Sequence, residues 1–212
     1  MKCVLEPAIN VYSREEYLRR IAAVKDLAEI IQFDVIDGIF ARPGNYNEPK
    51  IVGKEIKADK IDLHLMVRNI PAELKRWLII KPKRIILHVE AGGALTDYFE
   101  ILEKNKVKKG LAIAPSTPLE KISPFVKIVD YLLILSVAPG RNGQTFIPNT
   151  IDRLSTIHKK FPALKIGVDG GVGEKHLLEL KRVQASTVVV GSSIFRGEYR
   201  SNFQRFSEII KQ

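Results

Sequence analysis

Three titratable residues lie near the ends of short apolar segments of this sequence: Asp34, His64 and Asp169. A charged group in apolar surroundings is costly unless it is paired or functional. Taken singly, an aspartate near a glycine serves equally well as a turn or cap residue, and a histidine as a hydrogen-bonded core residue. Taken together, Asp, His and Asp at three strand ends indicate a metal site or an acid–base cluster. We therefore expect the three side chains to meet.

The neighbours of these residues follow the period of a β-strand, in which alternate side chains share a face. Gln32 therefore shares a face with Asp34, and Asp62 and Met66 share a face with His64. In barrel proteins, the carboxyl ends of the strands and the loops after them carry the chemistry.

Glycine-bearing turns follow three of the apolar segments and predict a phosphate site. They lie in the stretches Ser136–Gln144, Gly170–Gly171 and Val190–Phe195. Backbone N–H groups at helix N-termini bind anions, and phosphate in barrels commonly lies near the loops after strands seven and eight. One glycine–serine pair alone is weak evidence, whereas three such turns support one another. The expected phosphate-binding residues are Gly140, Asn142, Gly143, Gln144, Gly170, Gly171, Gly191 and Ser192.

Short apolar blocks recur along the chain with amphipathic segments between them, which is the pattern of repeated βα units. Most blocks lack the alternation of a half-exposed sheet, so both faces should be covered. Eight blocks predict one (β/α)8 TIM barrel as a single domain over residues 1–212. The blocks are Cys3–Ile9, Ile30–Ile36, Ile61–Val67, Arg84–Ala91, Lys109–Ala114, Tyr131–Val137, Lys165–Asp169 and Thr187–Val190. The segments expected to be helical are Arg14–Ala28, Ala72–Ile79, Leu95–Asn105, Ile151–Lys160 and Lys175–Val183.

The composition excludes several classes of protein. The only cysteine is Cys3, so a disulfide framework is excluded, and the start of the chain does not resemble a signal peptide. No apolar run reaches the ~18–20 residues that a membrane span needs. The formal charge of +10 comes from scattered Lys and Arg with acidic residues between them, which is typical of solvated helix faces. We expect a cytoplasmic protein without membrane contact, and nucleic-acid binding ranks last among the alternatives.

Seven stretches give the chain a resemblance to the ribulose-phosphate 3-epimerase family over nearly its whole length. They are Asp34–Phe40, Asp62–Val67, His88–Ala91, Ala114–Pro118, Ser136–Phe146, Val168–Val172 and Val190–Phe195. The resemblance implies a TIM barrel of the ribulose-phosphate-binding type and an isomerase of the pentose phosphate pathway. Such an enzyme interconverts ribulose 5-phosphate and xylulose 5-phosphate by removing the C3 proton and returning one from the opposite face.

The resemblance also implies a role for each titratable residue. Asp34 and Asp169 would be the two carboxylates that act as acid and base on opposite sides of the substrate. With His64 they would hold a divalent metal (Zn, Mn, Fe, Co or Mg) that stabilises the enediolate oxygens. Gln32 takes the place of the family's first metal-binding histidine. Because an amide oxygen is a poorer ligand than imidazole for Zn or Fe, the metal should bind more weakly or shift toward Mg or Mn.

Other positions around the sugar depart from the family pattern. A serine of the family's first strand is Ala8 here, so a contact to a substrate hydroxyl is either lost or replaced by Asn10. Of the family's methionines over the sugar, only Met66 is kept. His88 and Glu90 match a family stretch. From their period-two spacing on a central strand we interpret them as a buried polar pair inside the barrel rather than as catalytic residues.

The sequence leaves other functions open for a protein that binds a phosphorylated ketose. Gln32 and the lost serine suggest a binding protein that has lost the metal and most of its turnover. An epimerase or aldolase of altered specificity would use Asp34 and His64 on another ketose phosphate without a metal. Relatives of this kind commonly self-associate, so a homo-oligomer agrees with the resemblance, although the sequence does not fix the oligomeric state.

Overall fold

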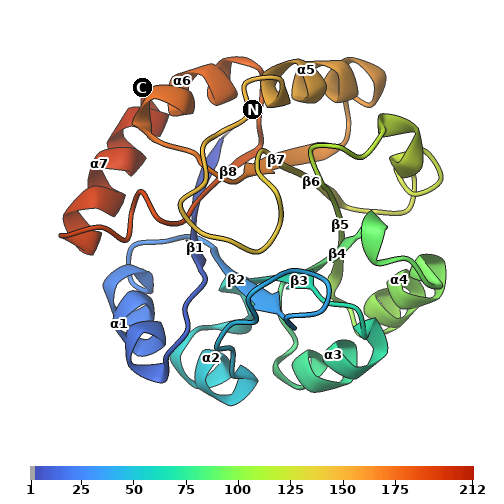
Figure 1. The fold of residues 1–212 in the computed structure, drawn as a ribbon, viewed down its shortest axis with the longest axis horizontal. Helices are drawn as coiled ribbons and strands as arrows, with labels where there is room; N and C mark the ends of the chain where they lie inside the picture. Colours follow the sequence, from blue (N-terminus) through green and yellow to red (C-terminus); the bar gives the residue numbers. More distant parts are fainter. Residues whose placement is uncertain (1–2) are drawn as a thin grey trace.

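A computed structural model describes residues 3–212 and shows a closed barrel of eight parallel strands (Figure 1). Each strand pairs with the next along the chain, and the last pairs with the first, so the sheet closes on itself. The strands are β1 (Val4–Ile9), β2 (Ile31–Ile36), β3 (Ile61–Met66), β4 (Arg84–His88), β5 (Lys108–Ile113), β6 (Tyr131–Leu135), β7 (Lys165–Asp169) and β8 (Thr187–Val190). The predicted TIM-barrel fold is therefore confirmed.

Helices surround the barrel and connect its strands (Figure 1). The α-helices are α1 (Arg14–Val24), α2 (Pro49–Glu55), α3 (Ile70–Trp77), α4 (Leu95–Lys104), α5 (Thr150–Lys160), α6 (Glu174–Arg182) and α7 (Tyr199–Lys211). Short 3-10 turns complete the connections at η1 (Ala58–Lys60), η2 (Leu78–Ile80), η3 (Val89–Ala91) and η4 (Leu119–Ile122).

The structure differs from the expected elements at several points. The sequence patterns predict neither α2, which is too short for a clear helical period, nor α7. The connection from β5 to β6 contains η4 where a regular repeat has an α-helix. The block Arg84–Ala91 is too long as a strand. The pairing of β4 with β5 ends with His88 opposite Ala112, and the chain then turns away as η3.

Two sets of buried apolar side chains support the barrel. The larger set packs between the sheet and the helices and includes Phe33 and Trp77, both 0% exposed. A smaller set fills the interior of the barrel and includes Ile86 and Leu133. Fully burying a large apolar side chain contributes about 1.5–3 kcal/mol, so these two sets hold the strand ends in fixed positions.

The register of the strands brings the candidate site residues to one level of the barrel. Asp34 pairs with His64 between β2 and β3, and Leu135 pairs with Asp169 between β6 and β7. In Figure 1 the long loop after β6 crosses in front of the barrel's interior. That loop therefore lies over the end at which the strands deliver these side chains.

A buried ionic cluster lies toward the other end of the barrel. Asp62 shares the inward face with His64, as its spacing predicts, but it forms an ion pair with Arg84 away from the candidate site. Arg84 Nη2 also lies 3.4 Å from Glu6 Oε1, and its guanidinium lies 3.4 Å from the centre of the Tyr131 ring. Burial, and then the nearby Asp62 carboxylate, raise the pKa of Glu6 from 4.5 to about 8, although Arg84 opposes the change.

We predict that Glu6 makes the stability of the fold depend on pH. Between its ordinary pKa of 4.5 and its folded pKa of about 8, the folded protein keeps a proton that the unfolded chain releases. The free energy of unfolding should therefore fall as pH rises through this interval, by on the order of 1 kcal/mol per pH unit. Glu6→Gln should flatten the dependence, as measured by urea unfolding between pH 5 and pH 9.

The control for this prediction is Glu15→Gln, which removes an exposed carboxylate of α1. It should keep the wild-type dependence on pH. An unchanged slope in Glu6→Gln would contradict the assignment of the proton to Glu6.

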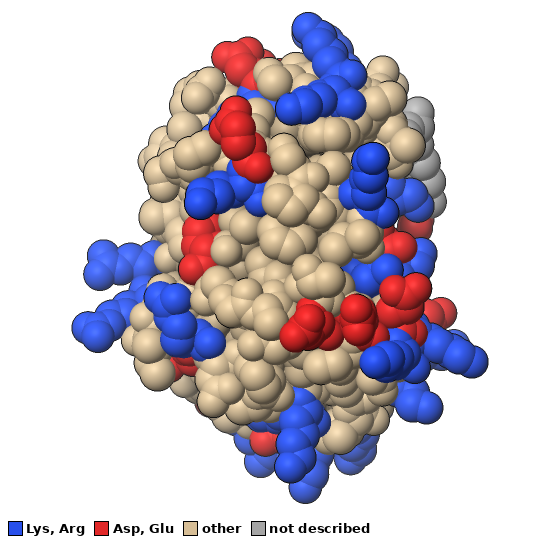
Figure 2. Space-filling view, turned by 90° about the vertical axis from the view of Figure 1, so that its right-hand side faces the viewer, with Lys and Arg blue, Asp and Glu red and all other residues tan. Residues whose placement is uncertain are grey.

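The surface carries charges of both signs. On the face shown in Figure 2, Lys and Arg side chains are interspersed with Asp and Glu rather than gathered in one basic field. Among residues 3–212, none of the helices combines the length and apolar character that crossing a membrane requires.

Candidate functional site

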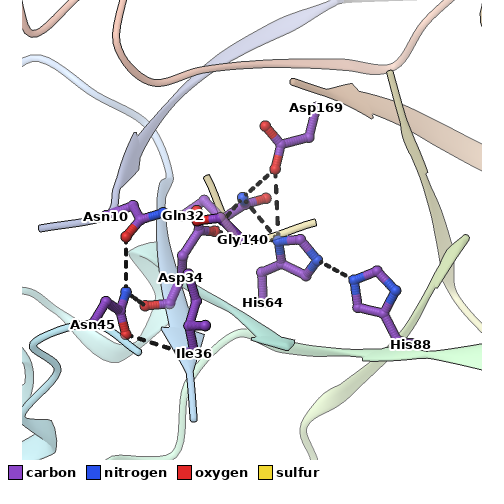
Figure 3. A network of polar contacts seen from close by, with 9 residues as sticks. All are labelled: Asn10, Gln32, Asp34, Ile36, Asn45, His64, His88, Gly140 and Asp169. Carbon is purple, nitrogen blue, oxygen red and sulfur yellow. Dashed lines mark hydrogen bonds and ion pairs between the residues drawn. The ribbon is translucent and has the colours of Figure 1, made fainter. Parts of the chain in front are cut away.

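Asp34, His64 and Asp169 meet at the carboxyl end of the barrel, where β2, β3 and β7 deliver them (Figure 3). His64 Nδ1 lies 3.2 Å from Asp34 Oδ1 and 3.6 Å from Asp169 Oδ2. The candidate ligand atoms of the three side chains all lie within 4.8 Å of one another. The three residues therefore form a candidate metal centre, as their types and positions in the sequence indicate.

Gln32 lies beneath this group and connects its two carboxylates. Its Nε2 donates hydrogen bonds to Asp34 Oδ1 and Asp169 Oδ2, each 2.9 Å long (Figure 3). The same nitrogen lies 3.5 Å from His64 Nδ1. Gln32 Oε1, by contrast, is buried and has no hydrogen-bond partner. The amide group thus places partial positive charge between the buried carboxylate of Asp34 and the half-buried carboxylate of Asp169.

The residues present fit a small divalent cation. Rotating the Gln32 amide by half a turn exchanges its oxygen and nitrogen with almost no change of shape, and a cation would then give Oε1 the partner it lacks. Gln32 Nε2, which the rotation would replace by Oε1, lies 2.9–3.5 Å from the candidate ligand atoms of Asp34, Asp169 and His64. His64 Nδ1 lies 3.2–3.6 Å from the two carboxylate oxygens. Adjacent ligand atoms are roughly 2.8–3.0 Å apart in an octahedral site with bonds of 2.0–2.1 Å, and roughly 3.3–3.6 Å apart in a tetrahedral site with bonds of 2.0–2.2 Å.

Burial and proximity change the proton affinities of the site. Burial, and then the negative charge of Asp34, raise the pKa of Asp169 to about 7, against the lowering effects of His64 and Gln32. Burial disfavours the charged form of His64, but the hydrogen bond to Asp34 and the surrounding carboxylates raise its pKa overall. A carboxyl group that can gain or lose a proton near neutral pH is suited to general acid–base chemistry.

Asn45, which the sequence patterns do not indicate, fixes the end of β2. Its Nδ2 donates to the backbone carbonyl of Asp34 at 2.8 Å, and its Oδ1 accepts from the N–H of Ile36 at 2.9 Å. Nδ2 also lies 3.1 Å from Asn10 Oδ1, and Asn10 donates to the carbonyl of Gly140 at 3.3 Å. Asn45 lies in an irregular loop, where no periodic pattern marks a residue as inward-facing.

A cleft opens above these side chains. All the predicted site residues except Gln32 line it, namely Asn10, Asp34, His64, Met66, Gly140, Asn142, Gly143, Gln144, Asp169, Gly170, Gly171, Gly191 and Ser192. The structure thus brings the expected catalytic, metal and phosphate residues to one cleft. Gln32 reaches it only through its contacts to the two aspartates.

Two predicted phosphate residues use their side chains to shape the loop after β6. Gln144 Nε2 donates to the carbonyls of Ala138 and Arg141 at 2.7 and 2.9 Å. Asn142 Nδ2 donates to the carbonyl of Asn10 at 3.0 Å, which ties this loop to the end of β1. In this structure their amide groups are therefore engaged within the protein.

Gly171 fits a position that has no room for a side chain. Its φ is +62°, and a Cβ atom would come within 2.4 Å of the backbone nitrogen of Phe146 and 2.7 Å of the carbonyl oxygen of Gln144. The close approach of the two loops after β6 and β7 therefore requires glycine here.

We predict that Gly171→Ala destabilises the protein by about 1–3 kcal/mol, because both the backbone conformation and the contact with the loop after β6 must change. Chemical denaturation measures the change. Gly173→Ala is the matched control, since Gly173 has an extended φ of −125° and its nearest neighbour would lie 3.9 Å from a Cβ. Equal unfolding midpoints for the two variants would contradict the steric argument.

His88 and Glu90 form a pair, with His88 Nδ1 2.9 Å from Glu90 Oε2. His88 is buried at the end of β4, but Glu90 is half-buried and lies in η3 beyond the strand, so the expectation of a fully buried pair on one strand is wrong for Glu90. The pair also reaches the candidate site, because His88 Nε2 lies 2.9 Å from His64 Nε2 (Figure 3). The spacing of His88 in the sequence indicates the face on which it lies, but not this contact.

Comparison with known proteins shows which family the chain belongs to. A family model described as "Ribulose-phosphate 3 epimerase family" matches residues 4–195. The ribulose-phosphate 3-epimerase of Aquifex aeolicus is 31% identical over 180 residues, which cover 82% of this chain and 81% of that protein. The enzyme of the same name from Escherichia coli K12 is 30% identical, with 79% and 77% covered. A cytoplasmic isoform from rice is 31% identical, with 79% and 76% covered.

Among solved structures, a tryptophan synthase α-subunit variant from Pyrococcus furiosus superimposes with a TM-score of 0.74 at 18% identity. The match covers 99% of this chain and 98% of that one. At this identity the likeness concerns the fold alone.

Proposed function

Because the chain belongs to the ribulose-phosphate 3-epimerase family, we propose that it interconverts ribulose 5-phosphate and xylulose 5-phosphate. Membership of this family makes it an isomerase of carbohydrates. The specific reaction would be removal of the C3 proton by one carboxylate, followed by return of a proton from the opposite face by the other.

The observation that carries the proposal is the pair of carboxylates, Asp34 and Asp169, at the floor of one cleft. They come from β2 and β7, which lie apart in the strand order, with His64 between them. Inverting a carbon without covalent attachment requires a donor and an acceptor on two faces of the substrate. A pKa of about 7 for Asp169 supports its use as the group that holds a proton while Asp34 removes one.

Gln32, Asp34, His64 and Asp169 would hold a divalent cation in this site. When bound, the cation supplies positive charge that stabilises the enediolate oxygens. Two carboxylates and an amide oxygen are hard ligands, so we propose that the site favours Mg²⁺ or Mn²⁺ over Zn²⁺ or Fe²⁺. Gly140, Gly143, Gly170, Gly171, Gly191 and Ser192 would surround the phosphate, with Asn142 and Gln144 shaping the loop, and Asn10 and Met66 would contact the sugar.

The first test is exchange of the C3 proton of ribulose 5-phosphate with deuterated solvent, followed by NMR in the presence of Mg²⁺ or Mn²⁺. Asp34→Asn and Asp169→Asn should each slow the exchange by about 10²–10⁴-fold, because each removes one proton-transfer group. Asp152→Asn, on the exposed side of α5, is the control and should keep the wild-type rate.

Absence of exchange in the wild-type protein with every divalent metal supplied would rule out the epimerase proposal. Binding of the ketose phosphate without exchange would then favour a phosphate-binding homologue. The bridge from Gln32 Nε2 to both carboxylates specifically supports that second candidate, because it satisfies the pair without a cation.

The second test replaces Gln32. Gln32→His should raise the affinity for Zn²⁺, because imidazole is the better ligand for this metal. Gln32→Leu should weaken binding of Mg²⁺ and Mn²⁺ by removing an oxygen ligand. Isothermal titration calorimetry of the metal-free protein measures both changes, and identical affinities in wild type and Gln32→Leu would exclude Gln32 as a ligand.

A further inference from the structure

A chain of hydrogen bonds runs from the candidate metal centre to the loop after β5. It passes from His64 Nε2 to His88 Nε2 at 2.9 Å, and from His88 Nδ1 to Glu90 Oε2 at 2.9 Å. Glu90 Oε1 accepts from the backbone N–H of Ala114 at 2.7 Å and from the hydroxyl of Thr117. Each residue in this series of hydrogen bonds therefore bonds to other groups of the protein.

The geometry of the two rings suits a directional hydrogen bond. His64 and His88 are 1% and 0% exposed, so water does not compete for their nitrogens. Their ring planes differ by 23° with centres 5.0 Å apart, so the nitrogen atoms face each other nearly edge to edge. Phe40 packs against His88 with ring centres 4.9 Å apart and helps to fix its orientation.

The carboxyl group of Glu90 determines which ring nitrogens of His88 and His64 carry a proton. An ionised carboxylate only accepts hydrogen bonds, and Glu90 is ionised: burial favours its neutral form, but the bonds from His88, Ala114 and Thr117 lower its pKa to about 2. His88 must therefore donate from Nδ1. The Nε2 atoms of the two rings share one hydrogen bond, and a neutral His88 ring that donates from Nδ1 can only accept at Nε2. His64 must then donate from Nε2.

We propose that Glu90 and His88 are positioning residues that place a proton on His64 Nε2 and so reserve the Nδ1 lone pair for a metal ion. The inference deepens the proposed function, on which its metal-binding consequence rests. It also revises the interpretation of His88 and Glu90 as merely a buried polar pair, because such a pair would be satisfied without the contact to His64.

The groups that bond to Glu90, at the end of this hydrogen-bond series away from His64, are held firmly in place. Thr117 and Ala114 lie in the loop after β5, and Arg153 of α5 donates to the carbonyl of Thr117 at 2.9 Å. This arrangement holds both donors to Glu90 Oε1 in place. Glu90 can therefore turn only Oε2 toward His88.

The decisive variant is Glu90→Gln, which keeps the shape of the side chain but changes one acceptor into a donor. The amide oxygen is needed by the N–H of Ala114, so the amide NH₂ faces His88 Nδ1. His88 must then accept at Nδ1 and carry its proton on Nε2, which leaves His64 Nε2 unprotonated and moves a proton to Nδ1. The change therefore inverts the proton arrangement without removing a contact.

Nitrogen-15 NMR of the imidazole rings reads this arrangement directly in the metal-free protein. The chain has four histidines: removing His158 and His176 in turn identifies their signals, and through-bond correlation of each remaining ring with the assigned backbone separates His64 from His88. We expect His64 Nε2 to carry a proton in the wild type and none in Glu90→Gln. With the metal, Glu90→Gln should bind Mn²⁺ about 10–100-fold more weakly, as measured by calorimetry.

The matched control is Glu73→Gln on α3. Glu73 is similarly shielded, at 20% side-chain exposure against 26% for Glu90, and it accepts a hydrogen bond from Trp77 Nε1 at 3.0 Å. It should leave the histidine spectra and the Mn²⁺ affinity at their wild-type values.

An unprotonated His64 Nε2 in the wild type overturns the proposal, and this measurement does not depend on the variant folding. The same protonation of His64 in wild type and in folded Glu90→Gln also overturns it. If the protons shift as expected but the wild type neither binds Mn²⁺ nor exchanges the C3 proton, the positioning role stands and the proposed function fails.

Discussion

The arrangement of this protein's cleft depends on two carboxylates that lie close together and are largely shielded from water. Asp34 and Asp169 are drawn out of water at the mouth of the barrel, where like charges repel and low polarity strengthens the repulsion. Their immediate neighbours reduce this repulsion. Gln32 donates one nitrogen to both, and His64 lies against both with Nδ1. A proton on Asp169 or a bound cation relieves the same repulsion, so acid–base chemistry and metal binding share one physical origin.

The barrel supplies the rigidity that such a site needs. Strand pairing sets the level of each inward side chain, and the apolar layer above the ionic cluster of Glu6, Asp62 and Arg84 separates that cluster from the cleft. The barrel therefore contains two separate clusters of polar side chains, which have different roles. The cluster around Arg84 has its own cation, whereas the cleft has two carboxylates and an imidazole without a permanent opposite charge. The cleft is therefore the end of the barrel where we propose that a cation binds.

Gln32, which stands where the resemblance implies a metal-binding histidine, would change more than one property of the proposed cation site. A carboxamide offers both an acceptor and donors, so it can bridge the carboxylates without a metal or turn its oxygen toward one. Imidazole cannot hold both carboxylates through a single nitrogen in this way. On the far side, His64 contacts His88, which in turn contacts Glu90. In the proposed function, the two sides together would set which cation the site holds and how tightly.

The sequence by itself determined the fold class and the residues of the cleft. Apolar blocks at regular spacing require a covered parallel sheet, and the polar residues at the ends of those blocks mark the chemistry. Which inward residues touch depends on the three-dimensional packing of the strands. Strand periodicity assigns a side chain to a face, but barrel closure and register choose its partners, as with His64 and His88, or Asp62 and Arg84. The role of Asn45 could not be predicted from the sequence for the same reason. An irregular loop has no period, and the contacts of Asn45 form only when its loop folds over β2.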